Sequence, residues 1–123
     1  MVRRTLPFVA TYRDSTARVL DALGDPTRRA VLELIRGGAR PVGEIARDLP
    51  VSRPAVSQHL RVLKEAGLVR DRQEGTRRLY SVAPEGLAAL RGYVEAYWDT
   101  ALAAFEEAAN ESSEEAKEEG GTG

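Results

Sequence analysis

Residues 42–66 carry two amphipathic helical patterns that are separated by a short turn. The first has the i, i+3, i+4, i+7 spacing of a single helix face, at Val42, Ile45, Ala46 and Leu49. The turn Leu49-Pro50-Val51 follows, and Ser52 is a suitable N-cap for a second helix because its hydroxyl accepts a hydrogen bond from a free backbone amide. A short helix, a tight turn and a capped second helix predict a helix-turn-helix.

The second helix of this unit, Arg53 to Ala66, divides into an apolar and a polar face. Its apolar stripe consists of Val56, Leu60 and Leu63. The polar residues that this leaves outward are Arg53, Ser57, Gln58 and Arg61. Arginine binds guanine through O6 and N7, glutamine pairs with adenine, and serine reaches bases or phosphates. Considered alone, the same face would also suit an ordinary solvated helix.

A basic hairpin follows this helix directly. Leu68 to Arg72 and Arg77 to Val82 predict two short strands around Gln73-Glu74-Gly75-Thr76, in which glycine supplies a positive φ. The arginines of the hairpin are Arg70, Arg72, Arg77 and Arg78, and its acids are Asp71 and Glu74. Guanidinium groups beside such a helix are placed to contact phosphates. The hairpin therefore favours a nucleic-acid interface over a merely solvated face.

The net charge of −1 conceals two halves of opposite sign. Residues 1–78 contain 16 Lys and Arg against nine Asp and Glu, a net charge of +7. Residues 79–123 contain two Lys and Arg against ten Asp and Glu, a net charge of −8. A basic front half indicates a polyanionic partner, and we expect that partner to be double-stranded DNA.

Capping residues predict two further helices before the helix-turn-helix. Asp14 or Ser15 begins the first of them, and Gly24 ends it. Asp25-Pro26 begins the next, which runs to about Arg36. Proline suits the first helical position because the amide hydrogen that it lacks would have no partner there.

Pro84 begins the longest predicted helix, which reaches Phe105 or Ala109. The element order is then ααααββα, a mainly α fold with a small β-hairpin, of the winged helix-turn-helix type. Residues 1–13 show no clear period and predict an N-terminal arm, and residues 110–123 predict a disordered acidic tail. The winged helix-turn-helix domain with a C-terminal dimerisation helix takes up residues 14–109.

Three segments resemble the ArsR/SmtB family of bacterial repressors. They are Leu23–Ile35, Val51–Val69 and the hairpin segment Gly75–Tyr80, and the resemblance covers roughly residues 15–105. Its most specific part is the Ser-x-His-Leu-x-x-Leu block that begins at Ser57. The resemblance implies a homodimeric, operator-binding repressor that often acts on its own promoter. The block Tyr93–Phe105 resembles a branch of the family that lacks metal ligands and is related to known autorepressors.

We expect the DNA-binding residues to lie on the second helix of the helix-turn-helix and on the hairpin. They are Ser52, Arg53, Ser57, Gln58, His59, Arg61, Arg72, Arg77 and Arg78. His59 is the single histidine of the sequence. As a lone imidazole, we interpret it as a hydrogen-bonding residue, near the DNA or partly buried, and not as a metal ligand.

The last helix carries two neighbouring apolar strips. The first has the 3-4 spacing of a helix that packs against another helix, at Leu87, Leu90, Val94, Tyr97 and Ala101. The second consists of Trp98, Leu102 and Phe105. One strip can cover the domain's own core and the other then requires a partner, so we expect a homodimer on a palindromic operator. The expected interface residues are Leu20, Leu90, Val94, Tyr97, Trp98, Ala101, Leu102 and Phe105.

Metal sensing is a common property of the resembled family. Its members use cysteines on the third helix or at the N-terminus, or His and Asp/Glu on the last helix. This sequence contains no cysteine, and its last helix contains no histidine. Because carboxylates alone do not make a selective transition-metal site, we expect no metal and no cofactor. The sequence does not identify an effector.

Other classes of protein find little support in the sequence. It contains no phosphate-binding glycine loop, no cysteine nucleophile and a single histidine, so we expect no enzyme activity. No apolar run approaches the ~20 residues that cross a bilayer and no signal peptide is recognisable, so we expect a cytoplasmic protein without membrane contact. One alternative stays open, a winged-helix module for protein–protein contact without specific DNA binding. The outward Arg, Ser and Gln side chains argue against it, because protein interfaces present apolar anchors.

Overall fold

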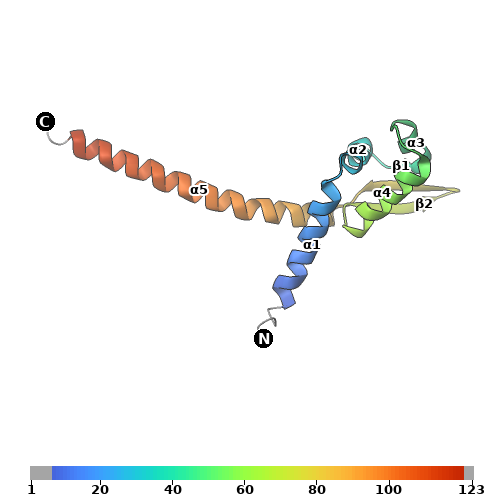
Figure 1. Cartoon of the computed structure of the whole chain (residues 1–123), viewed down its shortest axis with the longest axis horizontal. Helices are drawn as coiled ribbons and strands as arrows, with labels where there is room; N and C mark the ends of the chain where they lie inside the picture. Colours follow the sequence, from blue (N-terminus) through green and yellow to red (C-terminus); the bar gives the residue numbers. More distant parts are fainter. Residues whose placement is uncertain (1–6, 121–123) are drawn as a thin grey trace. The chain divides into compact units, whose positions relative to one another are not determined.

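The computed structural model describes the backbone of residues 7–120 and the side chains of residues 15–116. The chain divides into two units, residues 1–90 and 91–123. The elements are α1 (Pro7–Leu23), α2 (Pro26–Ile35), β1 (Arg40–Pro41), α3 (Val42–Arg47), α4 (Arg53–Glu65), β2 (Val69–Glu74), β3 (Arg77–Val82) and α5 (Pro84–Gly120). In the first unit, α2, α3 and α4 lie beside the sheet (Figure 1).

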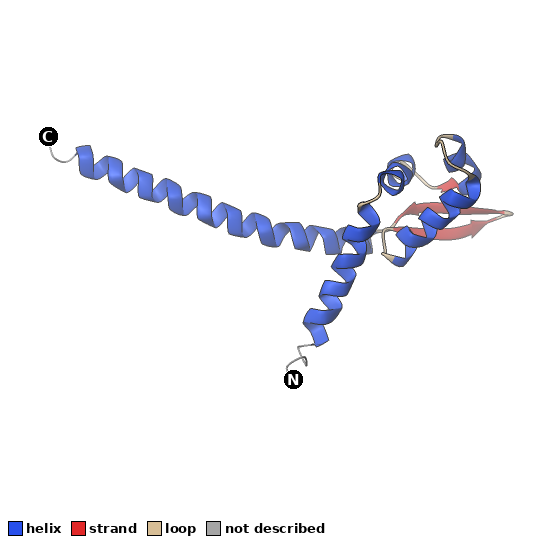
Figure 2. Cartoon of the chain, in the orientation of Figure 1, coloured by secondary structure: helices blue, strands red, loops and turns tan. Residues whose placement is uncertain are grey.

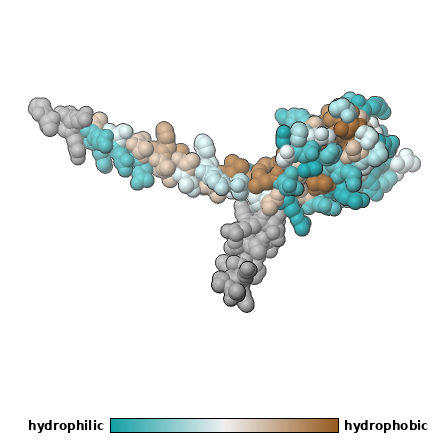
Figure 3. Space-filling model, in the orientation of Figure 1, coloured by the Kyte–Doolittle hydropathy of each residue, from teal (hydrophilic) through white to brown (hydrophobic). Residues whose placement is uncertain are grey.

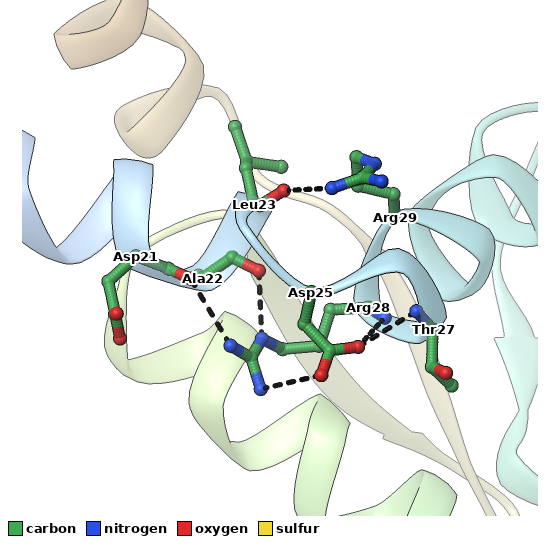
Figure 4. Close-up of polar contacts among 7 residues, drawn as sticks. All are labelled: Asp21, Ala22, Leu23, Asp25, Thr27, Arg28 and Arg29. Carbon is green, nitrogen blue, oxygen red and sulfur yellow. Dashed lines mark hydrogen bonds and ion pairs between the residues drawn. The ribbon is translucent and has the colours of Figure 1, made fainter.

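The turn between α1 and α2 is held by one carboxylate and two guanidinium groups (Figure 4). Oδ1 of Asp25 accepts hydrogen bonds from the backbone amides of Thr27 and Arg28, at 2.8 and 3.1 Å, and so caps α2 as predicted. Nε of Arg28 donates to the carbonyl oxygen of Ala22 at 2.8 Å. Nη1 of Arg29 donates to the carbonyl oxygen of Leu23 at 2.7 Å. The unpaired carbonyl groups at the end of α1 are thereby satisfied, and the two helices are joined.

α4 begins at the predicted residue, Arg53, and ends at Glu65, one residue before the predicted Ala66, which is its C-cap. The Ser52 hydroxyl accepts a hydrogen bond from the backbone amide of Ala55 at 3.3 Å, which caps the N-terminus. Gly67 follows the helix at a φ of +76°. The amides of Gly67 and Leu68 donate to the carbonyl oxygens of Lys64 and Leu63, at 3.0 and 2.9 Å. This hydrogen-bond pair is the Schellman arrangement, in which glycine avoids the strain of a left-handed conformation.

The hairpin belongs to a three-stranded antiparallel sheet with the order β1-β3-β2 (Figure 2). Val69 pairs with Val82 at its base and Glu74 with Arg77 at its tip, and Gly75 turns the chain at a φ of +63°. β1 is not in the predicted element order. It has only two residues, too few to show a period, and it exists because Arg40 and Pro41 pair with Tyr80 and Leu79 of β3.

The core of the first unit collects one or more residues from α1, α2, α3, α4 and β2. Its members are Val19, Ala22, Val31, Ile35, Ile45, Val56, Leu60, Leu63, Leu68 and Val69. The predicted stripe of α4 is therefore fully buried. Burying each such leucine or valine side chain is worth about 1.5–3 kcal/mol relative to leaving it in water, so the core also holds the opposite, polar face of α4 outward.

Both ends of the domain differ from the sequence-based prediction. α1 begins at Pro7 and not at Asp14 or Ser15, so residues 7–13 of the expected arm are helical, while residues 1–6 lie outside the described part. Pro7 is compatible with a first helical position, and no glycine or proline interrupts residues 8–13.

The expected disordered tail is helical as far as Gly120, and residues 121–123 lie outside the described part. Residues 93–119 contain no glycine or proline and are rich in Ala and Glu, both strong helix formers. The acidic and small residues from which the disordered tail is predicted do not prevent helix formation. Among the helices of residues 7–120, none combines the length and the apolar character that a bilayer span requires.

Candidate nucleic-acid interface

The polar face of α4 is exposed as its sequence pattern predicts. Ser52, Arg53, Ser57, Gln58 and Arg61 are all exposed, on the side opposite the buried stripe. Arg53, Ser57 and Arg61 recur at intervals of four residues and therefore lie in one row along the helix. Lys64 follows Arg61 by three residues and extends this row; the spacing is visible in the sequence, although Lys64 is not among the predicted site residues. The row presents hydrogen-bond donors that can reach base edges and phosphates.

His59 occupies a different position from this row. It is half-buried, one of the two environments expected for it.

The wing, which we define as β2, β3 and the turn between them, exposes its arginines. Carboxylates of the wing and of α3 lie close to three of them. Nη2 of Arg72 lies 3.0 Å from Oε2 of Glu74. Nη1 of Arg77 lies 3.9 Å from Oε1 of Glu44, in the first turn of α3. About 60% of the Arg72 and Arg77 side chains remains exposed, so these pairs are weak and open to exchange for phosphate.

A third carboxylate is held more firmly. Oδ1 of Asp71 lies 2.9 Å from Nζ of Lys64, and Oδ2 lies 2.8 Å from Nη1 of Arg78. Only 11% of the Asp71 side chain is exposed. The hydrogen bond from Lys64 holds the pKa of Asp71 below its ordinary value, and the guanidinium of Arg78 acts in the same direction. Neither Lys64 nor Asp71 is among the predicted site residues, because their pairing joins separate elements.

Two grooves border the wing. One lies between the wing, α3 and the first residue of α4, has a volume of about 460 Å³ and is lined by Arg47, Arg53, Arg77 and Arg78 together with Glu44, Gln73 and Thr76. The other has a volume of about 290 Å³ and is lined by Ser57, Arg61, Lys64, Asp71 and Tyr80. Guanidinium groups converging on a groove suit the binding of phosphate oxygens. The structure thus brings the predicted residues of α4 and the wing together.

α5 carries apolar residues on its exposed surface, and Figure 3 shows them in brown and tan along the helix. Leu90 is half-buried and packs against the core of the first unit. Beyond it, both predicted strips are exposed, with exposed fractions from 41% to 71% at Val94, Tyr97, Trp98, Leu102 and Phe105. Ala101 is exposed too, as is Leu20 of α1, at 39%. The sequence predicts that one strip covers the core of the domain. Leu90 of the first strip does so, whereas the residues of both strips from Val94 to Phe105 are exposed in the described part of the chain.

Residues able to bind a metal do not gather anywhere in the described part of the chain. Among residues 15–116, no three His, Cys, Asp or Glu side chains lie close enough together to hold an ion. Asp71 and Asp25, whose carboxylates are the most strongly hydrogen-bonded, are engaged by cations and backbone amides.

A family match, related sequences and a solved structure all assign this chain to the DNA-binding transcriptional regulators. A family described as "Helix-turn-helix domain" matches residues 23–72. The HTH-type transcriptional regulator Rv2034 of Mycobacterium tuberculosis is 57% identical over 97 residues, which are 79% of this chain and 90% of that protein. The transcriptional repressor SdpR of Bacillus subtilis is 41% identical over 64 residues, which are 52% of this chain and 71% of that protein.

A solved structure resembles the fold as well. It is the homodimeric winged helix-turn-helix DNA-binding domain of Mb0332 from Mycobacterium bovis, described as a possible ArsR-family transcriptional regulator. The TM-score is 0.64 at 35% identity, over 82% of this chain and 94% of that one. The winged helix-turn-helix fold and the expectation of a regulator, not an enzyme, are thereby confirmed. The chain belongs to the ArsR/SmtB family of winged helix-turn-helix transcriptional regulators.

Proposed function

We propose that the protein is a sequence-specific, homodimeric repressor that binds a palindromic operator at its own or a neighbouring promoter and needs no metal to do so. The observation that carries the proposal is the row Arg53-Ser57-Arg61 on the exposed face of α4, directly beside a basic wing. One helix face that reads bases and a hairpin that contacts phosphates are the two parts of a winged DNA-binding module.

The two parts have different tasks. Arg53 and Gln58 contact base edges, and each well-placed pair of this kind contributes about 1–3 kcal/mol of discrimination between bases. Ser52, Ser57 and Arg61 orient α4 on the groove, with His59 supporting the helix from its half-buried position. The wing residues Arg72, Arg77 and Arg78 contact phosphates, which contributes affinity and salt dependence but no sequence information.

The homodimer follows from the exposed surface of α5. Val94, Tyr97, Trp98 and Phe105 expose more than half of their side-chain surface, which is unfavourable for a helix that stays in water. A second copy of the same helix offers a matching surface with the 3-4 spacing of a helix pair. The homodimeric structure of the related Mb0332 domain supports this arrangement. Two copies can then enter the major groove about one turn, ~34 Å, apart and read both halves of a palindrome.

Independence from metal follows from the residue types that the chain provides. It contains no cysteine and one histidine, and that histidine lies in α4 and not in α5. The carboxylates of α5 are oxygen ligands, which do not select a transition metal without imidazole or thiolate. Repression should therefore persist in the presence of a chelator.

The decisive experiment is a titration of the protein against the duplex upstream of its own gene and against a random duplex of equal length, each at two salt concentrations. The operator should bind about 10³-fold or more tightly than the random duplex, and log K for both should fall with log salt. Binding that is absent, or that does not respond to salt, would instead favour a winged-helix module for protein–protein contact.

A further inference from the structure

Asp71 lies where three elements of the proposed DNA interface meet. Its backbone belongs to β2, whereas Lys64 comes from the last turn of α4 and Arg78 from β3. The two carboxylate oxygens are divided between the two cations, at 2.9 and 2.8 Å. We propose that Asp71 is a positioning residue that sets the wing against α4, and that operator recognition depends on it although its charge opposes DNA. This inference rests on the proposed function.

Burial distinguishes Asp71 from the other acids beside the wing arginines. Glu74 and its partner Arg72 are 61% and 60% exposed, and Glu44 is 44% exposed at 3.9 Å from Arg77. Exposed pairs of this kind contribute little, because water and salt screen them. The Asp71 side chain is 11% exposed and accepts two charge-assisted hydrogen bonds, which are stronger and more directional. It is therefore suited to fix a geometry.

The distance that Asp71 fixes is the width of a groove. The groove of about 290 Å³ between α4 and the wing has Lys64 and Asp71 in its wall, together with Ser57 and Arg61. At the base of the hairpin, Val69 is buried in the core and holds β2 near α4. Asp71 adds a second attachment two residues further along β2. Recognition sites lose function when their groups move by more than about 0.5 Å, so a single attachment at the base would leave the wing poorly placed.

The same pairing offsets part of the charge of two exposed cations. Without Asp71, Lys64 and Arg78 would present their full positive charge to phosphates of any sequence. Removal of the carboxylate should therefore affect the two kinds of DNA in opposite directions. Operator binding weakens because the wing and α4 no longer fit the site together, and random-duplex binding is unchanged or stronger because a negative charge has gone.

The test compares Asp71→Asn with Glu74→Gln, since each removes one negative charge from β2 without changing side-chain size. For Asp71→Asn we expect at least a tenfold loss of operator affinity, while random-duplex affinity stays equal or rises by up to about tenfold, with a salt slope steeper by up to about 1. Glu74→Gln should change binding to both duplexes by the same small factor. If Asp71→Asn behaves as Glu74→Gln does, the inference is wrong.

Three further measurements separate positioning from a general loss of structure. Asp71→Glu, which restores the charge, should recover operator affinity to within about threefold of wild type; failure to recover it would count against the ion pairs. A variant that is merely unstable would lose affinity for both duplexes by the same factor, and this result would also refute the inference. Should Asp71→Asn not fold, Lys64→Gln removes one of the two cations that Asp71 binds, at a position that is exposed. An equal loss of affinity for both duplexes would then overturn the proposal.

A double-mutant cycle provides the last check. Asp71→Asn should weaken operator binding much less in a Lys64→Gln background than in wild type, because the two residues act as one unit. Additive effects would contradict the inference. A wild-type protein that binds no duplex at all would instead refute the proposed function, so the two failures are distinguishable.

Discussion

The backbone amide nitrogen of Gly86 lies 2.7 Å from the carbonyl oxygen of Gly67, so the first turn of α5 rests directly on the chain that ends α4. This approach is possible because Gly86 has no side chain. A Cβ atom on Gly86 would lie 2.8 Å from the carbonyl oxygen of Gly67 and 2.9 Å from Cδ2 of Leu68. The contact holds the end of α4 and the start of α5 together within the first unit.

Replacement of Gly86 by alanine should therefore destabilise the domain. The added methyl group has to displace backbone and a buried leucine, so we expect the free energy of unfolding to fall by about 1–3 kcal/mol. Gly38→Ala is the matched control because no atom lies within 4 Å of its Cβ position; its effect should stay within about 1 kcal/mol. Urea denaturation of both variants measures the difference. Equal midpoints for the two variants would contradict the packing argument.

Gln58 should discriminate between sequences without contributing much general affinity. Gln58→Ala removes a side chain that can pair with adenine, so we expect a loss of about 1–3 kcal/mol on the operator and a much smaller loss on random DNA. Parallel titrations of the two duplexes at one salt concentration provide the measurement. Equal losses on both would show that Gln58 does not read bases.

Arg77 should contribute affinity without sequence preference. Arg77→Ala should weaken operator and random DNA about equally and reduce the slope of log K against log salt by about 1, the value for one lost phosphate contact. Adding Arg78→Ala should have a further effect on the operator, because it also breaks the pairing with Asp71. Arg36→Ala, which removes an exposed arginine paired with Glu33 on α2, serves as the control. An unchanged slope for Arg77→Ala would exclude the wing from the phosphate contacts.

Acid should destabilise the domain through Asp71 and Asp25. In the folded protein the pKa of each is lowered, by the hydrogen bond from Lys64 and by the backbone amide of Arg28 respectively. Such groups stabilise the fold above the ordinary aspartate pKa of about 3.9, and this contribution is lost as the pH falls through the lowered folded-state values. The free energy of unfolding should therefore decline below about pH 4, and less steeply in Asp71→Asn. Identical pH profiles for the variant and wild type would contradict this assignment.

A charge in the exposed strips of α5 should abolish the dimer. Leu102→Glu would bury an unpaired carboxylate between two helices, which costs several kcal/mol. We expect half the wild-type mass in analytical ultracentrifugation and loss of operator binding with α4 intact. Ala103→Glu is the control, because about 100° per residue places position 103 on the face opposite Val94 and Phe105. A wild-type protein that sediments as a monomer at micromolar concentration and still binds its operator tightly would disprove the dimer.

Local sequence is enough to predict where most elements begin or end and which face the helices of the domain bury. Asp25, Ser52, Gly67 and Gly75 act through hydrogen bonds and φ angles within a few residues of themselves, so their effects could be predicted from local sequence. The 3.6-residue period of α4 likewise predicted both its buried stripe and its exposed polar row. The tail is the local exception, because the high helix propensity of its Ala and Glu residues outweighs the acidity that suggested disorder.

The packing of separate elements, by contrast, sets which of their groups meet. β1 has no signal of its own and forms because Arg40 comes to lie beside Tyr80. Asp71 could have been one more exposed acid of a basic hairpin. The packing of β2 against α4 brings Lys64 to one of its oxygens, and the pairing of β2 with β3 brings Arg78 to the other. Gly86 carries no pattern that predicts its contact with Gly67. These pairings join separate elements, so they are set by the packing of the whole core and not by the residues on either side.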